Sequence, residues 1–332
     1  MTRSSRHIAV LLALSLAAVA LFAVGCTSKT EIAQPPAEKP AALKIGTLAT
    51  EDSLPLWVAE QRGYFATQGL TDLEIVLFQS AQERDTAFAS GAIDAFMGDI
   101  IAAANLEAGG KPTTIATIML GADQSQGRFG IAAAPKSGVK SITELANVPV
   151  GTSSATIQEY VLDGLMSEAG VPTSSVKVEE VKKVPVRFEL LMAGKLKAAA
   201  LPEPFLTLAE QGGAPLVASD TSATANLSQT VLVFSDKYLE QPGGAAAKTA
   251  VLNAWDIAVN DINKDPQSVL PLLVEKARLP ESLATTYKVN TYPTAQVPTQ
   301  AQVDAVLKWM KDKGYLKGDV VYEDLVATSA SK

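Results

Sequence analysis

The stretch RDTAFASGAIDAF at residues 84–96 has a counterpart in RFELLMAGKLKAA at residues 187–199, and both fit the pattern R-x6-G-x-[IL]-x-A. In each copy a helical segment ends at a glycine, Gly91 or Gly194, which suits the left-handed geometry of a helix C-terminus. A short apolar strand follows directly. The pattern predicts one unit of helix, glycine and strand in each of two α/β halves. Because a helix, a glycine and an apolar strand often follow one another in α/β proteins, the pattern can also recur by chance.

Short apolar segments alternate with helical ones on both sides of this repeat. Strands are expected at 43–48, 73–79, 92–98 and 113–120 in the first half, and at 128–135, 148–153, 176–181, 197–202 and 230–235 in the second. Helices are expected at 53–69, 81–91, 99–110, 141–148, 153–170 and 186–194, and then at 248–265, 266–277 and 300–314. Strands separated by helices indicate an α/β fold with mostly parallel sheets.

Polar residues gather where the expected strands end. Open α/β sheets bind ligands beyond the carboxyl ends of their strands, so we expect these residues on one rim between the halves. The candidates are Asp52, Ser53, Gln79, Ser80, Asp99, Thr152, Ser153, Ser154, Thr156 and Glu203.

Alternative roles stay open for several of these side chains. The hydroxyls of GTSSAT, residues 151–156, can cap a helix or hold an anion at its N-terminus. Glu203, between two prolines, can face solvent or accept from a ligand. Arg84, Arg128 and Arg187 are candidate counterions for an acidic ligand or ordinary solvated residues. Trp57 and Phe205 can stack on a ligand or belong to the core.

The N-terminus has the pattern of an export signal. Arg3 and Arg6 precede the apolar run at residues 8–25, and the single cysteine, Cys26, follows it directly. The run either stays as a membrane anchor or is removed before Cys26, whose thiol then carries lipid. Residues 26–42, polar and rich in proline, are expected to form an extended tether. Both alternatives place the body outside the cytoplasmic membrane.

Composition excludes several function classes. Removing residues 1–25 takes away two of 28 basic residues and no acid, which leaves 26 against 35 acidic and a net charge of −9. This balance gives no basic footprint for nucleic acid. Without the single histidine and with Cys26 at the terminus, no Ser-His-Asp or Cys-His catalytic group and no His/Cys zinc site can form. We therefore expect a binding protein that is not an enzyme and that needs no metal or cofactor.

The segments PLWVAEQRGYF, LEIVLFQSA, GAIDAFMGDI, SITELANVPVGTSSATIQEYVLDGLMSEAG and MAGKLKAAALPEPFLTLAEQ occur in one order. In that combination the chain resembles the solute-binding proteins of ABC importers in the nitrate, sulfonate, taurine and pyrimidine-precursor group, from Leu43 to about Trp309. Ala23-Val24-Gly25-Cys26 resembles a lipobox, with Ala23 where leucine is usual.

The resemblance implies a two-lobed clamp of the periplasmic-binding-protein type II, each lobe a mixed, mostly parallel sheet flanked by helices. Residues 1–25 would be the signal peptide, 26–42 the lipidated tether, 43–128 with 236–332 lobe 1, and 129–235 lobe 2. The strands RFGIAAA and TVLVFS would cross between the lobes. The contacts carried over are Asp52, Ser53, Gln79, Ser80, Asp99, Thr152, Ser153, Ser154, Thr156 and Glu203, to which the counterion candidate Arg84 is added as an expected ligand residue.

The implied function is capture of a small anionic or zwitterionic solute, like a sulfonate, nitrate or taurine, by a monomer held at the outer face of the membrane through Cys26. The partners would be an ABC permease and its cytoplasmic ATPase. A binding protein for a pyrimidine precursor or a flavin-like nutrient, a receptor, and a structural surface lipoprotein remain as alternatives.

Overall fold

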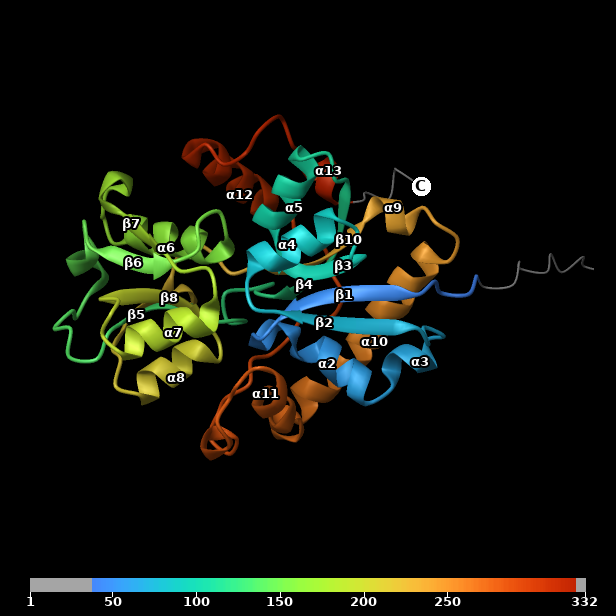
Figure 1. Ribbon diagram of the computed structural model, residues 1–332, viewed down its shortest axis with the longest axis horizontal. Coiled ribbons are helices and arrows are strands. Elements are labelled where there is room, and N and C mark those ends of the chain that lie inside the picture. Colours follow the sequence, from blue (N-terminus) through green and yellow to red (C-terminus); the bar gives the residue numbers. More distant parts are fainter. Residues whose placement is uncertain (1–37, 327–332) are drawn as a thin grey trace, which may run out of the picture. The chain divides into compact units, whose positions relative to one another are not determined.

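The computed structural model describes residues 38–326, which belong to one compact unit (Figure 1). The expected signal peptide, Cys26 and most of the expected tether lie outside the described residues. Between residues 38 and 326, every helix is too short or too polar to cross a lipid bilayer.

The first sheet has five strands in the order β2-β1-β3-β10-β4. Their bounds are β1 Leu43–Leu48, β2 Leu73–Phe78, β3 Ala95–Asp99, β4 Thr113–Leu120 and β10 Thr230–Ser235. β1 pairs in parallel with β2 and β3, whereas β10 runs antiparallel to β3 and β4. We call this sheet and the helices around it lobe 1.

The second sheet repeats this plan in the order β7-β6-β8-β5-β9. Its strands are β5 Phe129–Ala133, β6 Pro149–Thr152, β7 Lys177–Glu180, β8 Ala198–Pro202 and β9 Leu216–Ser219. β6 pairs in parallel with β7 and β8, and β5 runs antiparallel to β8 and β9. With its helices it forms lobe 2. The chain crosses between the sheets after β4 and again after β9, so β10, at the end of the expected lobe 2, pairs in the sheet of lobe 1.

Helices flank both sheets (Figure 1). The α-helices are α2 Leu54–Gln61, α3 Tyr64–Thr67, α4 Ala81–Ala89, α5 Ile100–Ala108, α6 Ile157–Glu168, α7 Val184–Met192, α8 Phe205–Gln211, α9 Asp236–Leu239, α10 Gly244–Lys264, α11 Leu270–Lys276, α12 Gln300–Lys313 and α13 Tyr322–Leu325. Short 3-10 turns are η1 Glu51–Ser53, η2 Ile142–Leu145, η3 Thr173–Ser175, η4 Asp220–Ser222, η5 Pro266–Val269 and η6 Glu281–Leu283.

The sequence repeat places equivalent groups in the two lobes. Its apolar residue, Ile93 or Leu196, packs against a glycine of the neighbouring strand, Gly46 in β1 or Gly151 in β6. A methyl group added at either glycine would lie 2.5 Å from that side chain. Because a close-packed sheet needs a bare backbone at these points, the repeat is a packing unit of each lobe.

The two-lobed α/β fold and all nine expected strands are confirmed. The sequence analysis missed β9, whose few apolar residues follow a proline at the edge of the sheet. It was also wrong about the helix expected at 141–148, where Ile142–Leu145 forms only a 3-10 turn. Asn147 there has a positive φ of 61°, which an α-helix does not accommodate.

Candidate functional site

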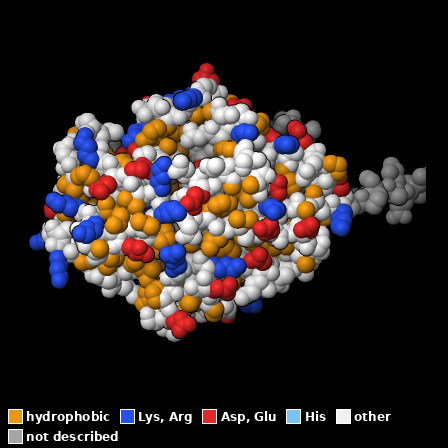
Figure 2. Space-filling view, viewed as in Figure 1, with side chains coloured by type: hydrophobic (Ala, Val, Ile, Leu, Met, Phe, Trp, Pro, Cys, Tyr) orange, Lys and Arg blue, Asp and Glu red, His pale blue; other side chains and the backbone are white. Residues whose placement is uncertain are grey.

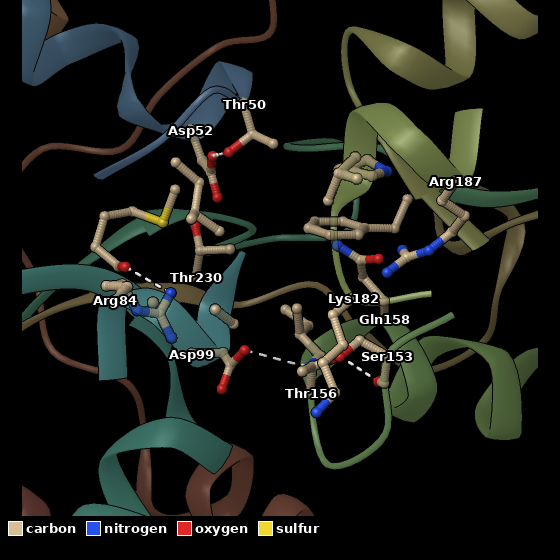
Figure 3. A pocket seen from close by; sticks show the side chains of 18 residues that line it. Thr50, Asp52, Arg84, Asp99, Ser153, Thr156, Gln158, Lys182, Arg187 and Thr230 are labelled. Carbon is tan, nitrogen blue, oxygen red and sulfur yellow. Dashed lines mark hydrogen bonds between the residues drawn. The ribbon is translucent and has the colours of Figure 1, made fainter. Parts of the chain in front are cut away.

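A cavity lies between the two lobes, where the parallel strands of both sheets end. The empty space inside it is about 470 Å³, including the part open to solvent. The polar lining residues are Thr50, Asp52, Arg84, Asp99, Ser153, Thr156, Gln158, Lys182, Arg187 and Thr230 (Figure 3). The apolar ones are Leu48, Ala81, Met97, Phe129, Ile157, Val184 and Pro202, with Gly98.

The wall from lobe 1 carries two buried carboxylates and one buried arginine. Arg84 is 1% exposed; it donates from Nη1 to the carbonyl of Met97 at 2.8 Å and from Nη2 to Asp85 at 2.7 Å. Burial raises the pKa of Asp99, opposed mainly by the charge of Arg84. Burial also raises the pKa of Asp52, opposed first by the hydrogen bond from Thr50 at 2.6 Å. In this wall the positive charge of Arg84 therefore offsets the negative charges of Asp52 and Asp99.

The wall from lobe 2 is built around Arg187, which is fully buried. Its Nη1 donates to the carbonyl of Ala200 at 2.9 Å, and its Nε and Nη2 donate to the carbonyl of Val181 at 2.9 and 2.7 Å. Burial lowers the pKa of Arg187 to about 9, and a longer-range attraction to Glu180 opposes the shift. Gln158 also lines the cavity, and its Oε1 is buried without a hydrogen bond from the described residues.

Carboxylates of the chain itself occupy the N-terminus of α6. The bonds run from Ser154 N to Glu180 Oε2 (3.0 Å), from Ala155 N to Glu159 Oε2 (2.8 Å) and from Ile157 N to Asp99 Oδ2 (3.2 Å). The last of these joins the two lobes across the cavity. The positive end of the helix, which the sequence offered as an anion site, therefore already has negative partners.

The structure brings five of the eleven predicted ligand residues into the cavity wall: Asp52, Arg84, Asp99, Ser153 and Thr156. The other six, which are not among its lining residues, are Ser53, Gln79, Ser80, Thr152, Ser154 and Glu203. Two of them have clear local roles. The Ser80 hydroxyl caps α4 by accepting from Glu83 N at 3.2 Å, and the Ser53 hydroxyl donates to the carbonyl of Leu48 at 3.0 Å.

Glu203 belongs to a second buried cluster between the lobes. It accepts from Arg128 Nη1 at 2.7 Å, and its Oε2 lies 3.5 Å from the hydroxyl of Tyr287. The same hydroxyl donates to Glu51, which also accepts from Asn290 N at 2.6 Å. Burial and then the charge of Glu203 raise the pKa of Glu51 to about 8. Sequence reasoning missed Glu51, since its partners come from residues more than 150 positions away.

Further contacts hold the lobes together on either side of the cavity. At one edge Lys182 donates to Gln82 at 2.7 Å and Lys183 pairs with Glu83 at 2.9 Å. At the other, Lys313 at the end of α12 pairs with Glu159 at 2.8 Å and with Asp163 at 2.9 Å, both on α6. The structure therefore describes a closed arrangement of the lobes.

The chemistry available in the cavity is polar and charged recognition. Among the described residues, no group of three or more His, Cys, Asp or Glu side chains is placed to hold a metal ion. Phe129 is the one aromatic residue in the described lining, so stacking surface is limited. On the face seen in Figure 2, acidic and basic side chains are interspersed without a large patch of one sign. Buried, oppositely charged groups on facing walls suit a small charged solute.

Comparison with known proteins identifies the family. The family model described as NMT1/THI5 like matches residues 50–268, which contain both walls of the cavity. The chain belongs to the NMT1/THI5-like family. A search of curated proteins found no match.

Solved structures share the fold at low sequence identity. The alkanesulfonate-binding protein SsuA from Xanthomonas axonopodis pv. citri, bound to MOPS, is 18% identical over 85% of this chain and 96% of its own, with a TM-score of 0.69. The periplasmic aliphatic sulphonate binding protein SsuA from Escherichia coli is 17% identical over 87% and 93%, with a TM-score of 0.70. The periplasmic nitrate-binding protein NrtA from Synechocystis PCC 6803 is 15% identical over 86% and 84%, with a TM-score of 0.68. At these identities the likeness shows the fold of periplasmic binding proteins.

Proposed function

We propose that this protein is the extracytoplasmic solute-binding component of an ABC importer, which captures a small anionic or zwitterionic solute between its two lobes. The observation that carries the proposal is the cavity itself, since buried charged side chains line both of its walls. Membership of the NMT1/THI5-like family and the likeness to sulfonate- and nitrate-binding proteins support it.

Closure would work by bringing the two walls onto the solute. A ligand favours the closed form only by the contacts that it gains there, so it must touch both lobes. Asp52 and Asp99 would supply contacts from lobe 1, and Ser153, Thr156 and Arg187 from lobe 2. The closed body would then present the solute to a membrane permease driven by an ATPase. None of these steps requires a catalytic group.

The proposal includes the N-terminal segment. A signal peptide at residues 1–25 would direct export, and lipid on Cys26 would tether a monomeric body at the outer face of the membrane. Mass spectrometry of the protein purified from membranes tests this: a diacylglyceryl cysteine at the new N-terminus is expected, and an intact residue 1 would contradict it.

The function is tested by thermal unfolding of the full chain in mild detergent, after removal of any solute that copurifies. The panel contains alkanesulfonates, 2-aminoethanesulfonate, nitrate, bicarbonate, pyrimidine precursors and flavins. A solute at 100 times its Kd stabilises a protein by about 2.7 kcal/mol, which is readily measured. Stabilisation by one class supports the proposal, whereas a structural surface lipoprotein would show no shift with any of them.

A further inference from the structure

The two arginines of the sequence repeat have the same backbone anchor but different electrostatic surroundings. Arg84 and Arg187 each donate from Nη1 to the carbonyl of the residue 13 positions later, in the middle of β3 or β8. Arg84 also bonds the carboxylate of Asp85 through two nitrogens. All three bonds that Arg187 makes go to neutral carbonyl oxygens. The two arginines thus have the same bond to a strand carbonyl, but only Arg84 has a carboxylate partner.

Arg187 has N–H groups that donate to none of the described residues. A guanidinium has five N–H groups, and three of those on Arg187 are used by Val181 and Ala200, which leaves two. Within residues 38–326 no carboxylate lies at ion-pair distance from it; Glu180 acts only at longer range. The side chain is fully buried and lines the cavity, toward which its guanidinium points in Figure 3.

An unpaired buried cation with free donors is costly for folding unless another group completes it. The loop before α6 and the first residue of the helix are less available to an anion, because Glu180, Glu159 and Asp99 already accept from the backbone N–H groups of residues 154, 155 and 157. The unpaired Gln158 Oε1, which also lines the cavity, is an acceptor and needs a donor. An oxyanion next to the guanidinium would accept from the N–H groups of Arg187 that the chain leaves unsatisfied.

The opposite wall has the opposite charge. Asp52 is 6% exposed and faces the cavity from η1; one carboxylate oxygen accepts from the hydroxyl of Thr50, and the hydroxyl of Thr230 also favours its charged form by lowering its pKa. Asp99 has both oxygens engaged, with Ala102 N at 2.7 Å and Ile157 N. Asp52 is therefore the carboxylate better able to receive a new donor, such as an ammonium group.

We propose that the solute is a small zwitterion, whose sulfonate or carboxylate binds the free N–H groups of Arg187 and whose cationic group lies against Asp52. This inference rests on the proposed function. It assigns Arg187 as the residue that fixes the anionic end and Asp52 as the residue that selects for a positive charge at the other.

The test uses three probes of matched size: 2-aminoethanesulfonate, ethanesulfonate and ethylammonium. Each is titrated calorimetrically into the full chain in mild detergent. The zwitterion is expected to bind at least about tenfold more tightly than either singly charged probe, because only it gains a charge-assisted hydrogen bond at both walls. Ethanesulfonate binding as tightly as the zwitterion would overturn the role given to Asp52.

Variants separate the two ends. Arg187→Met is expected to raise the Kd of the zwitterion on the order of 100-fold, as loss of a buried charged contact does. Asp52→Asn is expected to abolish the preference for the zwitterion over ethanesulfonate while leaving ethanesulfonate binding nearly unchanged. Arg62→Met is the matched control, since Arg62 pairs with Asp261 outside the cavity and its loss is expected to leave the Kd unchanged.

The outcomes distinguish this inference from the proposed function. If a solute of the larger panel binds and Arg187→Met binds it equally well, the inference is wrong and the solute-binding function stands. If no probe of the three binds while a solute that is not a zwitterion does, the assignment of a zwitterionic solute is wrong. If no solute of either set binds, the proposed function itself is contradicted.

Discussion

The walls from lobe 1 and lobe 2 come from one structural plan but hold their charges in different ways. In lobe 1 the lining carboxylates Asp52 and Asp99 lie near Arg84, so charges of both signs offset one another. In lobe 2 the lining cations, Arg187 and Lys182, meet no lining carboxylate of their own lobe. The comparison teaches that a repeated backbone unit determines the position of a side chain. The charges of the neighbouring residues then determine whether that side chain stabilises the fold or is available to a ligand.

The largest effect is expected from removing the arginine of lobe 1. Arg84→Met leaves Asp85 without its partner and Asp52 and Asp99 without a nearby cation, and breaking such a buried group costs about 3 kcal/mol of unfolding free energy. Urea denaturation at pH 7 measures it. Arg62→Met, at a half-exposed pair, is the control with an expected loss below about 1 kcal/mol. Equal losses in the two variants would mean that Arg84 does not compensate the wall.

The next prediction concerns Glu51, behind the wall of lobe 1. Its pKa is about 8 in the folded protein and near 4.5 when unfolded, so the native state binds the extra proton between these values. The contribution of Glu51 to stability is therefore full below pH 4.5 and falls as the pH rises toward 8, by at most about 1.4 kcal/mol per pH unit. Glu51→Gln should reduce that slope, measured by urea denaturation at several pH values.

The exposed carboxylate Glu179 provides the control for this pH series. Glu179→Gln should retain the wild-type slope. Some slope will also remain in Glu51→Gln, because burial raises the pKa of Asp220 to about 6. A wild-type protein whose stability rises steadily from pH 5 to 8 would contradict the account of lobe 1 as rich in buried carboxylates.

The repeat packs a side chain against a strand glycine in both lobes, but the surroundings of the two glycines differ. A methyl group at Gly46 meets Ile93 at 2.5 Å and the ring of Phe78 at 3.0 Å, while one at Gly151 meets only Leu196 within 3.4 Å. We expect Gly46→Ala to cost about 1–2 kcal/mol and Gly151→Ala less, because a single leucine end can move aside. Denaturation curves check both, and a larger loss in Gly151→Ala would be the wrong order.

The smallest effect is expected at the rim of lobe 2. Lys182 is exposed and reaches across to Gln82, so its charge is screened by solvent. Lys182→Ala should weaken solute binding by less than about threefold, an effect that fades in high salt. A loss as large as that of Arg187→Met, measured by the same calorimetric titration, would shift the anion-binding role to the rim.

The sequence predicted the fold well because periodicity and turn residues are local signals. It predicted nine of the strands, the repeat and the rim on which Asp52, Asp99 and Thr156 lie. It did not distinguish among Arg84, Arg128 and Arg187, because a linear pattern does not show which buried groups each guanidinium contacts. The partners of Arg128, for example, are Glu203 and Glu210, 75 and 82 residues on. It also could not foresee that Asp99, 58 residues away, would occupy the N-terminus of α6.

By this account Arg187 binds the solute, whereas Arg84 stabilises the fold. The most direct measurement is the unfolding free energy of Arg187→Met beside the wild type, without solute and with saturating 2-aminoethanesulfonate. Without solute, the variant should lie within about 1 kcal/mol of the wild type, because the loss of the bonds to carbonyls is offset by removal of an unpaired buried cation. The stabilisation by solute should disappear. A variant as unstable as Arg84→Met, or one that the solute still stabilises fully, would contradict the account.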